Sequence, residues 1–208
     1  MGKVKKRKLF APSNGPDCVI LNWAEHPEED LKYYAEAFHN MAKKLASQYK
    51  DEWPLSSFEA CPIVYLYRHS FELYLKATLV YGNELLLWRN KKAIDLNNVI
   101  GAKSSHILMN YIPDLVKVFK EAGWKWDWEI DGFRSRKEFT DIVKEFDKYD
   151  VKSFTFRYPM DKNRKYTLPK HFSFGMVNFM SLMDHMLKVL HSAICGLEQI
   201  VDSERQAR

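Results

Sequence analysis

Cysteine is scarce in this sequence of 208 residues, and the three that occur lie far apart at Cys18, Cys61 and Cys195. No two of them have the C-x-x-C spacing of a zinc knuckle, and an odd number does not indicate a disulfide framework. Thiols that stay reduced are typical of the cytoplasm. We therefore expect a cytoplasmic protein without structural disulfides.

Long apolar runs and cofactor motifs are also missing. No stretch approaches the roughly 20 apolar residues that a membrane-spanning helix needs, and no apolar run follows the basic N-terminus as it would in a signal peptide. The sequence contains no G-x-G-x-x-G, no P-loop and no G-x-S-x-G. His185 and His191 lack the i, i+4 spacing of paired metal ligands. We expect no membrane contact, no cofactor and no metal.

The net charge of +5 belongs to the N-terminal tail and not to the whole chain. Outside that tail, 27 basic residues balance 27 acidic ones. The five basic residues of the tail are Lys3, Lys5, Lys6, Arg7 and Lys8. Residues 1–26 are therefore interpreted as a basic tail and loop, which either keeps the protein in solution or contacts RNA.

The spacing of the apolar residues predicts a mainly all-α protein. One helical domain is expected over residues 27–204, with a Trp-rich insert at about 123–133. Gly82 is expected to end the second helix, and Pro113 to kink or split the third. The second helix is apolar almost all round, so it belongs at the centre of a bundle. The five expected helices span about 27–49, 57–81, 104–122, 135–149 and 173–204.

The sequence predicts that two short runs near the end of the chain are extended and not helical. Phe154, Phe156 and Tyr158 alternate with polar residues, and a second run covers residues 166–168. They flank a polar turn at residues 160–164, an arrangement typical of a β-hairpin. We predict a small β-hairpin or extended segment near residues 153–168.

Charged side chains interrupt the apolar second helix at Arg68, Glu72 and Lys76, each one turn from the next. Burying an arginine or a glutamate costs several kcal/mol unless the charge is paired and hydrogen-bonded. These residues and the neighbouring His69 are either an ion-pair network that fixes the helix or a polar site within the bundle. His106 lies at the start of the next helix, from where it could reach the same cluster.

A second group of polar candidates lies between residues 157 and 171. Arg157 follows Phe156 in a rigid segment, and its guanidinium either forms a salt bridge to Glu72 or another acid or binds a phosphate. Arg164 and His171 are the only Arg-then-His pair at such spacing just before the last helix. Either they are surface residues, or they form a reacting pair.

Three segments together resemble a set of HEPN proteins, a bacterial family of RNA processing and phage defence. They are the run from Leu66 to Lys76 that contains Arg-His-Ser-Phe-Glu-Leu, the Ser105-His106 pair, and the run Phe154-Thr-Phe-Arg-Tyr-Pro-Met-Asp161. The resemblance covers about residues 55–200. It implies a bundle of four or five helices that forms a homodimer through the helices around a polar site.

The resemblance also implies an activity. Nuclease members of the family cleave RNA without metal, through an arginine and a histidine with four to six residues between them, the histidine being at the start of a late helix. Arg164 and His171 match that spacing, while Arg68 and His69 lie in the most recognisable segment. Glu72, His106, Arg157 and Asp161 complete the candidate polar cluster.

Two functions are therefore expected from the sequence. The first is an effector that binds or cleaves RNA, in phage defence or as part of a toxin–antitoxin pair with a partner protein. The second is a non-catalytic dimeric interaction or nucleotide-binding module within a defence assembly.

Overall fold

The computed structural model describes most of the chain. The described residues are Pro16, Cys18, Val19, Leu21, 30–48, 58–101, 104, 106–124, 135–150 and 152–207. The predicted basic tail and loop (1–26) lies outside them except for those first four residues. The predicted Trp-rich insert (123–133) does so too, except for Gly123 and Trp124.

The described residues form an all-α bundle, as the apolar periodicity predicts. They contain six α-helices and one 3-10 helix. These are α1 (Asp30–Gln48), α2 (Ala60–Trp88), α3 (Leu96–Val99), η1 (Leu108–Tyr111), α4 (Ile112–Glu121), α5 (Arg136–Tyr149) and α6 (Met176–Gln206). None of the helices described is both long enough and apolar enough to cross a lipid bilayer.

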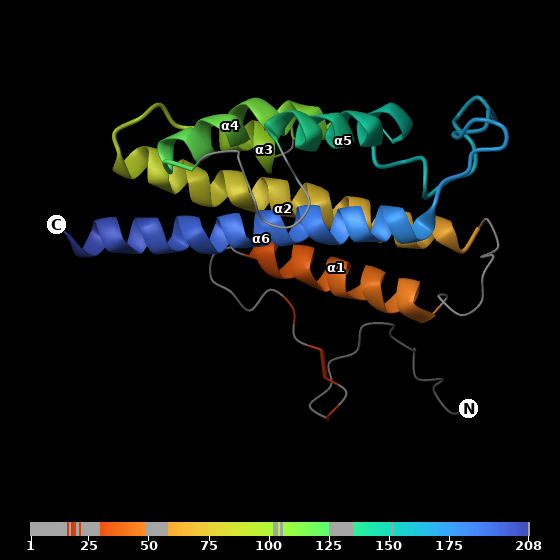
Figure 1. The fold of residues 1–208 in the computed structure, drawn as a ribbon, viewed down its shortest axis with the longest axis horizontal. Helices are drawn as coiled ribbons and strands as arrows, with labels where there is room; N and C mark the ends of the chain where they lie inside the picture. Colours follow the sequence, from red (N-terminus) through yellow and green to blue (C-terminus); the bar gives the residue numbers. More distant parts are fainter. Residues whose placement is uncertain are drawn as a thin grey trace, which may run out of the picture.

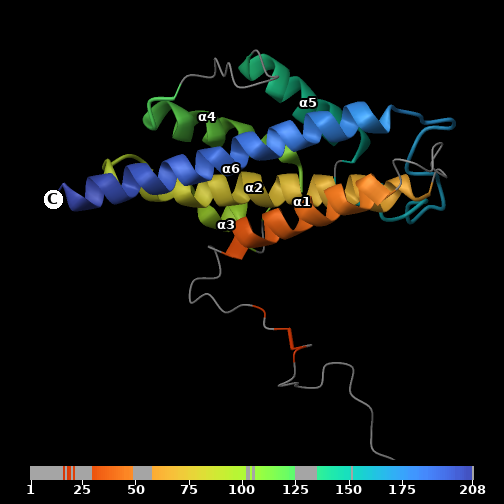
Figure 2. The same cartoon turned by 60° about the horizontal axis from the view of Figure 1, so that its bottom comes forward.

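The two longest helices, α2 and α6, run side by side through the middle of the bundle (Figure 1). Helix α1 covers them on one side, and α4 and α5 lie on the other, which the turned view repeats (Figure 2). The central position of α2 agrees with its composition, because Tyr67, Phe71, Leu75 and Leu86 are all buried on it. The loop that precedes α6 projects from one end of the bundle (Figure 1).

The prediction that Gly82 ends the second helix is wrong. Helix α2 continues through Gly82 to Trp88. A Cβ atom added to Gly82 would overlap both Cγ atoms of Val118 on α4. The glycine is therefore explained by the close approach of two helices and not by a helix stop.

Replacing Gly82 by alanine tests this explanation. Alanine normally stabilises a helix interior by about 0.5–1 kcal/mol relative to glycine. Here the overlap with Val118 reverses the sign, and we expect Gly82→Ala to lower the free energy of unfolding by about 1–3 kcal/mol. Urea denaturation followed by circular dichroism measures the change, with the exposed Gln199→Ala on α6 as control. A stabilised variant would contradict the packing explanation.

The third expected helix divides into two elements and begins later than residue 104. The 3-10 helix η1 ends at Tyr111, and α4 begins at Ile112 with Pro113 in its first turn. Proline fits there because the first N–H groups of a helix have no partner within it. The N–H groups of Leu108 and Met109 at the start of η1 donate to the Asp147 carboxylate at 3.0 and 2.7 Å.

The predicted β-hairpin near residues 153–168 is not confirmed. The two runs meet at a single antiparallel bridge between Met160 and Tyr166, and the described part of the chain has no strand. Asp161 shapes the turn between them, because its carboxylate accepts hydrogen bonds from the N–H groups of Asn163 and Lys165. The turn forms as expected, but Phe154 and Phe156 follow irregular backbone.

A buried polar contact joins the three long helices. The imidazole of His39 on α1 lies 2.7 Å from the carboxylate of Asp184 on α6, and the hydroxyl of Tyr67 on α2 donates to the same carboxylate at 3.0 Å. His39 is 8% exposed. Satisfied polar groups at this depth help to fix how the helices pack. Nothing in the sequence pattern pointed to this contact.

Candidate nucleic-acid interface

Arg68 is at the centre of a buried ion-pair cluster between α2, η1 and the end of α5. Its side chain is 0% exposed. The guanidinium donates to the Glu72 carboxylate at 2.5 Å, lies 3.4 Å from the Asp150 carboxylate, and also donates to the backbone carbonyl of His106. A guanidinium buried in this way has no access to a substrate, and the loss of one of its partners would leave a buried charge unpaired and destabilise the fold. The geometry therefore favours the ion-pair network for Arg68.

The Glu72 carboxylate interacts with three side chains of this cluster, those of Arg68, Lys76 and His106. Lys76 lies 2.8 Å from its carboxylate and the Nδ1 atom of His106 lies 2.9 Å away. Burial alone would raise the pKa of Glu72, but the charges of Lys76 and Arg68 and the hydrogen bonds from Lys76 and His106 outweigh it and lower the pKa to about 2. Glu72 is therefore ionised at neutral pH, which keeps the cluster intact.

Asp150 connects this cluster to the loop that follows α5. One oxygen of its buried carboxylate accepts from the N–H groups of Phe154 and Thr155 at 2.6 and 2.8 Å, while the other faces Arg68. The ion pairs thus hold the base of the loop in place. Asp150 was not predicted from the sequence, because an aspartate after a helix is common and only the fold brings it next to Arg68.

The structure separates His69 from Arg68, although they are neighbours in the sequence. The His69 ring lies edge-on to Phe38 on α1 at 4.5 Å and stacks on Tyr65 at 5.7 Å. Burial lowers the pKa of His69, so the ring is neutral at pH 7. Arg68 and His69 therefore face different neighbours and do not form one site within a single chain.

Arg157 does not reach Glu72, and none of the acidic residues that the structure describes forms an ion pair with it. Its guanidinium lies over the rings of Tyr65 and Tyr158, at 5.4 and 5.9 Å from their centroids. It also donates to the backbone carbonyl of Ser153. The Arg157 side chain is exposed and close to α2. It is therefore placed where a phosphate could approach it.

The loop from residue 152 to residue 175, which we call the basic-aromatic loop, carries a concentrated positive charge. It contains six basic residues and one acidic residue, Asp161, so its net charge equals the +5 of the entire chain. All six cations are exposed, and within the described residues none of them takes part in an ion pair. They are Lys152, Arg157, Lys162, Arg164, Lys165 and Lys170.

Aromatic side chains are interleaved with these cations. Six of the residues in the loop are Phe or Tyr, and three of them are largely exposed: Tyr166 at 86%, Tyr158 at 50% and Phe174 at 41%. Exposed rings next to unpaired cations are typical of surfaces that bind single-stranded nucleic acid, on which bases stack and phosphates pair with the charges. The balanced charge of the chain outside its tail hid this local excess.

Arg164 and His171 both lie in this loop, and both have left-handed backbone. Their φ angles are +60°, and the side chains are exposed. A non-glycine residue in this region costs about 1–3 kcal/mol, and such residues cluster at functional sites. Arg164 closes the Asp161 turn, where glycine or asparagine is the usual residue, and its N–H donates to the Asp161 carbonyl at 3.0 Å. The loop thus holds an exposed arginine in a backbone conformation that is unfavourable in free energy.

No protein-family model, curated protein or solved structure matches this chain. The similarity to HEPN proteins seen in three sequence segments therefore stays a prediction. The geometry of the basic-aromatic loop, and of the cluster that supports it, is the basis for a functional proposal.

Proposed function

We propose that the protein is an effector that binds single-stranded RNA through the basic-aromatic loop. One observation carries the proposal: six exposed cations, none of which has an acidic partner in the described part of the chain, are interleaved with exposed aromatic rings in one loop. The phosphates of RNA would pair with the lysines and arginines, and its bases would stack on rings such as Tyr158 and Tyr166. The buried cluster around Arg68 would hold this loop to the bundle through Asp150.

The same loop supports a proposal of metal-independent cleavage. The imidazole of His171 would take the proton from a ribose 2′-hydroxyl, and the 2′-oxygen would attack the adjacent phosphorus. The bond to the 5′-oxygen of the next nucleotide breaks, and that oxygen takes up a proton. Arg164 would hold the phosphate while negative charge develops on it. The products are a 2′,3′-cyclic phosphate and a free 5′-hydroxyl.

Replacing three lysines of the loop tests RNA binding. We expect the variant Lys162→Gln/Lys165→Gln/Lys170→Gln to bind a labelled single-stranded RNA at least ten times more weakly than the wild type, because up to three phosphate contacts are lost. Fluorescence anisotropy at fixed salt measures both affinities. The three lysines are exposed, so the folded state is expected to survive the change.

A matched variant separates a local effect from a general loss of charge. Lys44→Gln/Lys92→Gln/Lys120→Gln removes the same charge from exposed positions outside the loop. We expect its affinity to stay close to that of the wild type. Equal loss in both variants would show that RNA responds only to net charge, and no binding by the wild type would overturn the proposal.

The cellular role, the partner protein and the oligomeric state follow from the resemblance and are also proposals. A role in phage defence or a toxin–antitoxin pair, a partner protein and a homodimer belong to the HEPN reading of the sequence. The exposed apolar residues Tyr33 and Met41 on α1 and Val177 on α6 support an association of copies. If the wild type binds RNA without cleaving it, the non-catalytic interaction or nucleotide-binding module is favoured.

A further inference from the structure

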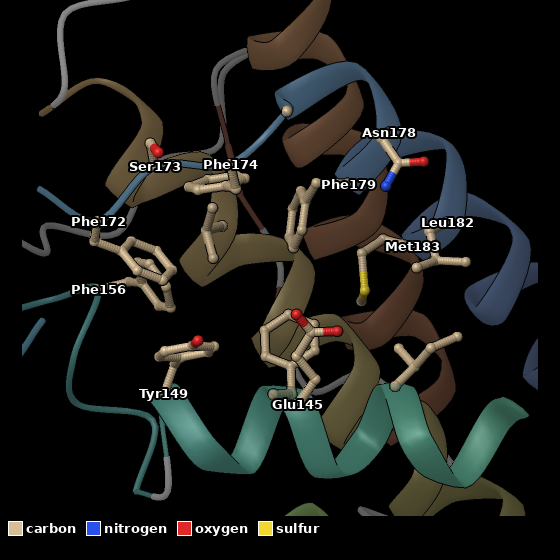
Figure 3. Close-up of a pocket in the computed structure, with 14 residues that line it drawn as sticks. Glu145, Tyr149, Phe156, Phe172, Ser173, Phe174, Asn178, Phe179, Leu182 and Met183 are labelled. Atoms are coloured by element: carbon tan, nitrogen blue, oxygen red, sulfur yellow. The ribbon is translucent and has the colours of Figure 1, made fainter. Parts of the chain in front are cut away.

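A pocket of about 230 Å³ lies beside the basic-aromatic loop, between α5, the start of α6 and the last residues of the loop. Six of the fourteen residues around it are aromatic, and several of their rings are seen in Figure 3. This volume is below that of pockets for drug-sized ligands, which usually span ~300–1,000 Å³. The pocket therefore suits a small flat group.

Five rings form a continuous series around the pocket. The centroid distances along the series are 4.9, 5.7, 5.6 and 5.9 Å, and the interplanar angles lie between 45° and 68°. No two neighbouring rings in the series stack face to face, and none of the five residues is fully buried. The rings, in order, are Tyr149, Phe172, Phe174, Phe179 and Phe146. Such faces accept a planar aromatic ligand.

Three exposed residues with polar side chains line the pocket: Glu145, Ser173 and Asn178. Glu145 rises from α5 toward the enclosed space, and Asn178 lies on α6 near Phe179 (Figure 3). The carboxylate of Glu145 only accepts hydrogen bonds, whereas the Asn178 amide both donates and accepts. A ligand with N–H groups along one edge would therefore match the Glu145 carboxylate.

Aromatic pockets accept organic cations as well as nucleic-acid bases, and the charge beside this pocket distinguishes the two. An organic cation would suit rings and a carboxylate, but the neighbouring loop carries a net +5 and would repel it. A base attached to phosphates is attracted by the same charge. Lys170 and His171 directly precede Phe172, a pocket residue, and consecutive Cα atoms lie about 3.8 Å apart. The positive charge of Lys170 therefore lies close to the pocket wall.

We infer that this pocket holds one guanine base of the single-stranded RNA bound by the loop. The inference rests on the proposed function. Guanine presents two adjacent N–H donors, N1–H and the N2 amino group, which match the two oxygens of the Glu145 carboxylate. Adenine, cytosine and uracil lack that pair of donors on one edge. The purine also offers the larger face for stacking.

Uridine heptamers that differ only in the central base test the inference. We expect the heptamer with a central guanine to bind about tenfold more tightly than those with adenine, cytosine or uracil, measured by fluorescence anisotropy. Glu145→Gln should remove the preference for guanine without weakening the all-uridine heptamer. Phe174→Leu, which keeps an apolar side chain but removes the ring, should weaken the guanine heptamer most.

The outcomes distinguish failure of this inference from failure of the proposed function. Asp141→Asn is the control, because it removes an exposed carboxylate of α5 that does not line the pocket, and its preference for guanine should equal that of the wild type. If all four heptamers bind equally, or if Glu145→Gln keeps the preference, the guanine pocket is overturned while RNA binding stands. If the wild type binds none of them, the proposed function fails.

Discussion

Replacement of Glu72 by alanine is expected to lower the free energy of unfolding by about 3–5 kcal/mol. The buried Arg68 guanidinium loses the carboxylate at 2.5 Å, and Lys76 loses its partner at 2.8 Å. An uncompensated buried charge of this kind is among the most costly results of a single substitution. Urea denaturation monitored by circular dichroism measures the change.

A more exposed ion pair between α2 and α6 provides the control. Glu84 pairs with Arg205, and their side chains are 36% and 50% exposed. Because surface pairs contribute about 0–1 kcal/mol, Glu84→Ala should change stability little. A Glu72→Ala variant as stable as Glu84→Ala would show that the cluster around Arg68 does not hold the fold.

The Glu72 carboxylate also makes a specific contribution to acid sensitivity. Its pKa in the folded state, about 2, is below the ordinary value of 4.5, so its stabilising effect is complete above pH 4.5. The effect is lost as pH falls from that value through about 2, because the unfolded chain then binds the proton more tightly. The stability difference between the wild type and Glu72→Gln should therefore shrink over this pH range.

Changing His171 to asparagine is expected to lower the rate of RNA cleavage by about 10²–10⁴-fold, the usual contribution of a general base. Asparagine tolerates left-handed backbone, so the φ of +60° adds no new strain, and its amide does not take up a proton at pH 7. Arg164→Gly removes the guanidinium at Arg164, which also has a φ of +60°, and relieves strain. We expect it to lose cleavage while its thermal stability stays equal or rises.

The assay uses a labelled single-stranded RNA in excess EDTA, with the cyclic phosphate identified by mass spectrometry. Asn90→Gly is the matched control, because Asn90 also has a positive φ of 53° but follows α2, away from the loop. Its cleavage rate should equal that of the wild type. Full activity in His171→Asn would remove His171 as the base, and cleavage abolished by EDTA would contradict the metal-free mechanism.

The helices of the bundle could be predicted from the sequence because their pattern is local. Apolar spacing placed α1, α5 and α6 to within a few residues, and the all-round apolar character of α2 placed it at the centre. Gly82 misled the prediction because its local preference is a helix stop, whereas its contact with Val118 comes from a helix far along the chain. At this position tertiary packing outweighs the local preference of glycine for the end of a helix.

The site could be predicted in part, for a similar reason. Glu72 and Arg68 are one turn apart and His106 was a candidate partner, so their meeting followed from sequence and helix geometry. Asp150 and the aromatic pocket could not be found this way, since they depend on how α5 and the loop pack against α2 and α6. The excess charge of the basic-aromatic loop was visible in the sequence, but the overall balance of charge masked it.

The salt dependence of RNA binding tests the role of the basic-aromatic loop most directly. For a single strand, the logarithm of the binding constant falls with the logarithm of the salt concentration, with a slope of about −0.7 for each phosphate contact. Replacing Lys162, Lys165 and Lys170 by glutamine should therefore make the slope up to about 2 units less steep than in the wild type. The control with Lys44, Lys92 and Lys120 replaced should keep the wild-type slope. A slope that is the same in all three proteins would contradict RNA binding by this loop.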